Sequence, residues 1–249
     1  MRGLGLTCLL ILCIAAAALA QPEGPRSLPE GEPGPDQPPD GDAAALPGIE
    51  LDREARRLEL SGQVANREAD WLELLVAKSG HRVHETILTT EAEPSHIHLA
   101  LLMLGLEPGR PLQHEPGKDG QGWKVLPPRG PAVKIELIYQ RDGQTLTHPA
   151  SRWVHNNATD EPLQSDRWLF TGSQLVEADG ERFYLADRNG TVISLVSFGD
   201  DLLARDTTTT NRTDQKQWAA VSERIPPEGM PVTICITPVD GDERPAGEN

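Results

Sequence analysis

The segment that most clearly indicates the fold class is VTICIT, residues 232–237. Apolar side chains alternate there with threonines and with Cys235, and this period of two is typical of a β-strand with one face toward a core. Residues 49–51 and 57–60 alternate in the same way on either side of a charged stretch, which predicts a hairpin with one solvated face. The more continuously apolar run WLELLV, residues 71–76, predicts a central strand.

Turn residues and a helical pattern complete the expected secondary structure. Further strands are predicted at residues 86–89, 133–140, 146–149, 168–171, 182–186 and 192–198. The dipeptides Asp142-Gly143 and Asn189-Gly190 are typical of tight hairpin turns. A helix is expected over residues 94–104, because a proline opens the segment and a glycine follows it, and a weaker pattern favours a second short helix at 214–222. We therefore predict a sheet-rich α+β fold with mostly antiparallel strands.

The ends of the chain differ in composition from its middle. Residues 1–20 combine an early arginine, an apolar run and a final small-residue triplet, which predicts a secretory signal peptide cleaved after Ala20. An uncleaved membrane anchor is the alternative. Residues 21–48 hold eight prolines and six acidic residues, so we expect a disordered, Pro-rich acidic tether. A single domain over residues 49–239 and a disordered acidic tail over 240–249 complete the predicted organisation.

The formal net charge of −15 is spread unevenly along the chain. The tether carries −5, the tail −3 and Arg2 +1, which leaves −8 for the predicted domain. That sign disfavours binding to nucleic acid or to anionic membranes, so membrane attachment is expected only through an uncleaved signal. The sequence holds no glycine-rich phosphate loop, so no nucleotide cofactor is expected. Signal cleavage would leave Cys235 as the one cysteine, which excludes an intramolecular disulfide and a four-cysteine iron–sulfur cluster.

Five motifs occur in an order that carries a family resemblance. They are RLELSG (57–62), HET (84–86), PSHIHLALL (94–102), WLFTGS (168–173) and IPPEGMPV (225–232). Together they resemble the YdjY-type domain, a family of exported bacterial proteins, common in planctomycetes, with no established activity. The resemblance covers residues 49–238 and implies export, but it implies no mechanism. Two positions depart from the usual family pattern: Thr86 stands where serine is usual, and Ser197 where asparagine is usual.

Histidines cluster in the segment 81–98, which holds four of the seven and several glutamates. Imidazole and carboxylate groups are zinc-type ligands, and both can transfer protons. The candidate catalytic residues are therefore His84, Glu85 and His98, and the candidate ligands of a divalent metal such as zinc are His84 and His98. Apart from such a metal, no cofactor is expected. The alternative is that His84 is a hydrogen-bonded structural residue and that His98 lies on a helix surface.

Other polar groups give weaker support to catalysis. The pair GS at 172–173 lacks the second glycine of a nucleophile elbow, and Asp200-Asp201 fit a solvated loop better than a calcium site. We therefore favour a non-enzymatic exported module, periplasmic, attached to the cell envelope or secreted, that binds a protein, a peptide or an envelope component. The alternative is a metal-binding protein or metal-dependent hydrolase centred on the three candidate residues.

Overall fold

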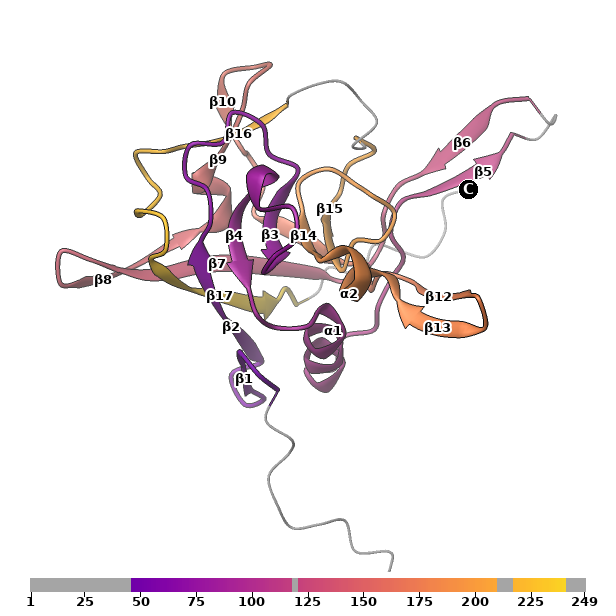
Figure 1. The fold of residues 1–249 in the computed structure, drawn as a ribbon, viewed down its shortest axis with the longest axis horizontal. Coiled ribbons are helices and arrows are strands. Elements are labelled where there is room, and N and C mark those ends of the chain that lie inside the picture. The colour runs from indigo at the N-terminus through magenta and orange to yellow at the C-terminus, as the bar shows by residue number, and fades with distance from the viewer. Residues whose placement is uncertain (1–45, 118–120, 210–216, 241–249) are drawn as a thin grey trace, which may run out of the picture. The chain divides into compact units, whose positions relative to one another are not determined.

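The computed structural model describes residues 46–117, 121–209 and 217–240, and their main feature is a closed β-barrel of eight strands (Figure 1). In ring order the strands are β2 (Arg57–Val64), β17 (Pro231–Pro238), β7 (Ala132–Arg141), β11 (Arg167–Phe170), β15 (Leu203–Arg205), β14 (Thr191–Ser194), β3 (Leu74–Lys78) and β4 (Thr86–Thr90). The pairing of β4 with β2 closes the ring. The predicted signal peptide, nearly all of the tether and the tail beyond Asp240 lie outside the described residues.

The barrel is mixed, since β3 pairs with β4 and β14 pairs with β15 in parallel, whereas the other six pairings of the ring are antiparallel. Strands and bridges hold 46% of the described residues, and helices only ~12%. The prediction of a mostly antiparallel α+β fold is therefore wrong. Alternation shows which face of a strand is buried, but it does not show which strands pair or whether a sheet closes on itself.

The barrel interior is filled by the apolar face of each strand. In β2 these side chains are Leu58 and Leu60, and in β17 they are Ile234 and Ile236, all fully buried. The predicted alternation of VTICIT is thus confirmed. Cys235 points to the other face of β17, where it is also buried, and burial raises the pKa of its thiol.

Several predicted elements occur with shifted ends. The hairpin of β1 (Ile49–Asp52) with β2 and the helix α1 (Pro94–Met103) are confirmed. The run 71–76 becomes a strand only from Leu74, and the predicted strand 192–198 ends at Ser194. The described part of the expected helix 214–222 contains a strand instead, so that prediction is wrong.

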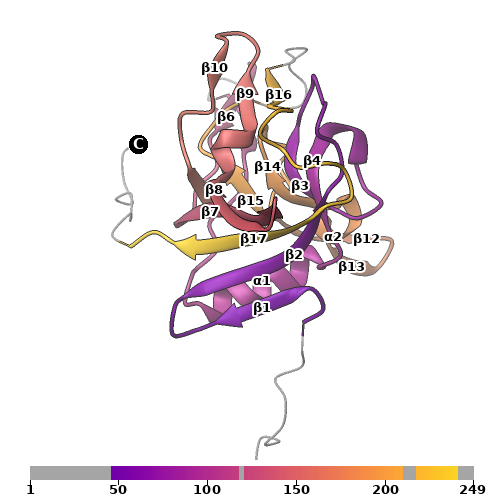
Figure 2. The ribbon, with the colours of Figure 1, turned by 90° about the vertical axis from the view of Figure 1, so that its left-hand side faces the viewer.

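Smaller helices, hairpins and strands lie outside the ring of eight strands. They are the 3₁₀ helices η1 (Val83–Glu85) and η2 (Ala150–Trp153), the helix α2 (Leu185–Asn189), the strand β8 (Gln144–Pro149) paired with β7, the hairpins β5 (Gln113–Pro116) with β6 (Trp123–Leu126) and β12 (Leu175–Ala178) with β13 (Glu181–Tyr184), and a small sheet of β9 (Val154–Asn156), β10 (Glu161–Pro162) and β16 (Trp218–Ala220). The hairpins β5–β6 and β12–β13 project on the same side of the barrel in Figure 1, and α1 and β1 lie at one end in both views (Figures 1 and 2). Within the described ranges, no helix is long and apolar enough to span a bilayer.

Candidate functional site

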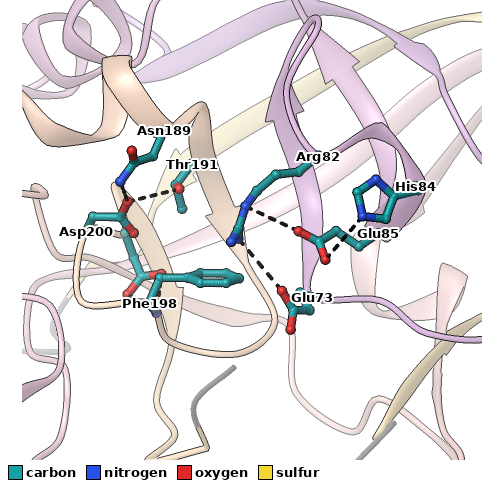
Figure 3. A network of polar contacts seen from close by, with 9 residues as sticks. Glu73, Arg82, His84, Glu85, Asn189, Thr191, Phe198 and Asp200 are labelled. Carbon is teal, nitrogen blue, oxygen red and sulfur yellow. Dashed lines mark hydrogen bonds and ion pairs between the residues drawn. The ribbon is translucent and has the colours of Figure 1, made fainter. Parts of the chain in front are cut away.

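Each of the two parallel strand pairs is joined by a crossover segment, and these two segments bring a group of buried polar residues together. The crossover 79–85 joins β3 to β4, and the crossover 195–202 joins β14 to β15. They meet at Glu73, just before β3. Its backbone N–H donates to the carbonyl of Glu85 at 3.0 Å, and its carbonyl accepts from the N–H of Leu195 at 2.9 Å. Figure 3 shows the side chains gathered at this junction.

Arg82 and Glu85 are held together by a tight backbone turn. Arg82 has φ of 48° in the left-handed region, and its carbonyl accepts from the N–H of Glu85 at 3.1 Å. The turn places Arg82 Nε 3.2 Å from Glu85 Oε1, while Arg82 Nη1 lies 3.8 Å from Glu73 Oε2 (Figure 3). One guanidinium therefore lies between two carboxyl groups.

Glu73 and Glu85 form a buried carboxyl pair, with side chains 8% and 11% exposed. Burial is the main cause that raises the pKa of Glu73 to about 7, and the charge and hydrogen bonding of Glu85 raise it further. The guanidinium of Arg82 opposes this rise. Glu73 can therefore gain or lose a proton close to neutral pH.

The side chain of Phe198 lies between this carboxyl pair and a second cluster of polar side chains, formed by Asp200, Asn189 and Thr191 (Figure 3). The Arg82 guanidinium carbon lies 4.0 Å from the centroid of the Phe198 ring, in a cation–π contact (Figure 3). Phe198 also forms part of the wall of an open groove of about 450 Å³. The groove is lined by Leu112, Gln113, His114, Glu115, Gln174, Leu185, Asn189, Phe198, Gly199 and Asp200. These residues come from β5 and the residue before it, from the segment before β12, from α2 and from the crossover 195–202.

Asp200 is the buried acid of the groove, with 4% of its surface exposed. Its Oδ2 accepts hydrogen bonds from Asn189 Nδ2 at 2.6 Å and from Thr191 Oγ1 at 3.3 Å (Figure 3). Its Oδ1 is also buried and has no hydrogen-bond partner in the described parts of the chain. The interpretation of Asp200-Asp201 as a solvated loop is therefore wrong.

Asp201 fixes the conformation of the crossover that carries Phe198 and Asp200. Its carboxylate accepts from Ser197 Oγ at 2.6 Å and from the backbone N–H groups of Phe198 and Gly199 at 3.2 Å. Complete burial raises the pKa of Asp201. Ser197, one of the two departures from the family pattern, thus contributes directly to the shape of the groove wall.

The predicted site residues are only partly brought together. His84 Nε2 lies 3.8 Å from Glu85 Oε2, but the His84 side chain is 85% exposed. His98 has other partners: its Nδ1 lies 2.8 Å from the hydroxyl of Tyr184, and its ring packs edge-on against Phe170. Burial lowers the pKa of His98. His98 thus stands in a hydrogen-bonded aromatic cluster.

No group of three His, Cys, Asp or Glu side chains in the described ranges is arranged to hold a metal ion. The metal hypothesis for His84 and His98 stays a prediction. Elemental analysis of the purified full chain and of a His84→Ala variant tests it.

Sequence reasoning missed Glu73, Arg82 and Asp200 as parts of this region. A signal for Glu73 was present, because a lone acid within the apolar run 71–76 has to be buried with its neighbours. Arg82 gave no comparable signal, since it lies in the polar segment 79–85, whereas Asp200 and Asp201 stand between the apolar runs 195–198 and 202–204, which is a comparable signal of burial.

The comparisons with known proteins identify a family. The family model of the YdjY domain matches residues 49–237, and the chain belongs to this family. No curated protein and no solved structure shows significant similarity to the chain.

Proposed function

We propose that the protein is an exported, non-enzymatic binding module that receives an extended polypeptide segment in the groove. The observation that carries the proposal is the groove itself, which lies between β5 and the base of the β12–β13 hairpin. A peptide can be bound there by backbone and side-chain contacts from separate parts of the chain.

The two hairpins support this proposal because each is a two-stranded sheet in the described residues. Such sheets have strand edges with unpaired N–H and C=O groups, to which an extended segment can add as a further strand. Exposed apolar side chains lie on the same hairpins: Trp123 in β6 is 70% exposed, and Leu175 in β12 is also exposed. Exposed aromatic and aliphatic groups on projecting hairpins are typical anchors of a protein interface.

The internal contacts of the groove also favour binding over catalysis. Asn189 donates to Asp200, and Gln174 donates to the carbonyl of Gly199. The polar groups of these side chains are engaged in hydrogen bonds that hold the walls of the groove in place. A preformed surface of this kind suits the binding of a ligand.

A library of short random peptides, selected on the full chain, tests the proposal. A photo-crosslinking residue replaces Gln113 in the groove or, as a matched control, Gln144 at the exposed turn of the β7–β8 hairpin. We expect selected peptides to crosslink at position 113 and not at 144. Failure to select peptides above an unrelated protein of equal charge, or equal crosslinking at both positions, would contradict the proposal.

Export is the second part of the proposal, and residues 1–20 support it by their charge, apolar run and small-residue triplet. Expression of the full chain in a Gram-negative bacterium tests it. The periplasmic protein is expected to begin at Gln21 on N-terminal sequencing. A full-length chain that stays in the cytoplasm would contradict export.

A further inference from the structure

We propose that the groove recognises a lysine side chain of the bound segment, and that Asp200 Oδ1 accepts a hydrogen bond from its ammonium group. The inference rests on the proposed function, because it names the chemistry that the groove selects. It starts from an atom that the fold itself leaves without a partner.

The Asp200 carboxylate is held in one orientation, and only one of its two oxygens accepts hydrogen bonds from the described residues. Asn189 and Thr191 both donate to Oδ2, so the side chain cannot turn without losing these bonds. Oδ1 is buried, and no donor reaches it from the described residues. A buried carboxylate oxygen without a donor is costly, and nearly all buried polar atoms in proteins have a partner. Asp200 lines the groove, and a ligand that moves aside the atoms covering Oδ1 and brings a donor to it recovers this cost.

The charge of the groove specifies a cationic donor. Its lining residues include two acids, Glu115 and Asp200, and no lysine or arginine. Among the described residues, Asp200 forms no ion pair with a basic side chain. The nearby guanidinium of Arg82 contacts Phe198, Glu73 and Glu85 instead. The two acids repel an anionic ligand, and His114 is the one other titratable side chain of the lining.

The geometry favours lysine over arginine and over a metal ion. Arginine binds a carboxylate best through two parallel hydrogen bonds, which need both oxygens, but Oδ2 already accepts two bonds. An ammonium group needs only one acceptor at a time and suits the single free oxygen. A metal ion would need further ligands, and the described residues provide no group of three. The ring of Phe198 offers an apolar wall for the methylene groups of a lysine stem.

The test uses a peptide obtained by the selection above and its variants, with the full chain. The affinity of wild-type protein is measured for the parent peptide and for peptides in which each lysine is replaced by acetyl-lysine or by arginine. We expect acetylation of one lysine to weaken binding about tenfold to a hundredfold, as for the loss of a charge-assisted hydrogen bond. Arginine at that position is expected to bind between these two limits.

The protein variant Asp200→Asn is expected to remove most of the difference between lysine and acetyl-lysine. The matched control is Asp142→Asn, in the exposed turn between β7 and β8, which is expected to leave the difference unchanged. Circular dichroism and thermal melting confirm that each variant is folded. Should Asp200→Asn fail to fold, Glu115→Gln at the exposed part of the groove takes its place, with a smaller expected loss of lysine preference.

The outcomes separate the two proposals. Peptides that crosslink at position 113 but show no lysine dependence would overturn the lysine inference and leave the binding proposal standing. A lysine dependence that Asp200→Asn and Glu115→Gln both leave intact would overturn the role of Asp200. If no peptide is selected, both proposals fall.

Discussion

At the scale of single residues, Glu73 lies between Leu72 and Leu74, and all three side chains are buried. A folded-state pKa of about 7 stands above the ordinary value of 4.5. Between these two values the folded protein keeps a proton that the unfolded chain has released. The free energy of unfolding therefore contains a contribution from Glu73 that is complete below pH 4.5 and is lost as the pH rises toward 7.

Replacement Glu73→Gln should remove this pH dependence, because the amide keeps the shape of the protonated acid and does not ionise. The free energy of unfolding of the variant, minus that of wild type, should therefore be larger at pH 8 than at pH 5. The expected increase is on the order of 3 kcal/mol. Urea denaturation at both pH values measures the gain, with Glu50→Gln on the exposed face of β1 as control. An equal stability difference at pH 5 and pH 8 would count against the raised pKa of Glu73.

The predictability of the site also differs residue by residue. The proximity of His84 and Glu85 follows from their neighbouring positions. The partners of His98 could not be predicted, because Tyr184 and Phe170 come from segments far away in the sequence. For the same reason, the meeting of Glu73 with Arg82 depends on a crossover whose existence requires the parallel pairing of β3 and β4.

At the scale of elements, two similar dipeptides have different structures. Asp142-Gly143 forms the predicted hairpin turn, with φ of 52° and 74°, between Arg141 and Gln144. The prediction for Asn189-Gly190 is wrong: Asn189 ends α2, and Gly190, with φ of 71°, caps that helix. Glycine after asparagine favours left-handed backbone in both settings, so the local sequence does not distinguish a hairpin turn from a helix end.

The two glycines should respond differently to alanine. Around Gly143 no atom lies within 4 Å of an added Cβ, so Gly143→Ala meets only backbone strain and should cost about 1 kcal/mol. At Gly190 an added Cβ would also overlap the side chain of His81, so Gly190→Ala should cost at least about 1 kcal/mol more. Urea denaturation of both variants measures the two costs. Equal losses would show that the contact with His81 relaxes freely.

At the scale of the whole molecule, most strands could be predicted from the sequence but the barrel could not. Alternation located the apolar faces of β2 and β17, yet their pairing joins residues from opposite ends of the domain, such as Gly62 and Val232. Gly62 also pairs with Thr90 of β4, so it marks the position where β2 has neighbours on both sides. No local pattern encodes such a closure, since it depends on the length, tilt and order of all eight strands.

Closure at Gly62 leaves little room for a side chain. A Cβ there would lie 2.9 Å from Ile234 Cδ1 and 3.0 Å from the carbonyl oxygen of Thr89. Gly62→Ala should therefore reduce the free energy of unfolding by roughly 1–3 kcal/mol. In an Ile234→Val background, which removes Cδ1, the cost should be smaller. A double-mutant cycle by urea denaturation measures this coupling, and strictly additive effects would contradict steric contact at the closure.

The position of β17 also dictates when the barrel can form. This strand lies between β2 and β7 and pairs with both, although it follows every other barrel strand in the chain. During synthesis, β2 and β7 therefore lack their shared neighbour until residues 231–238 have been made. Pairings between distant segments form slowly, and strands that wait for a partner expose edges that can associate with other chains. The ring can therefore close only once residues 231–238 are available, and until then the edges of β2 and β7 that β17 will cover are open to association with other chains.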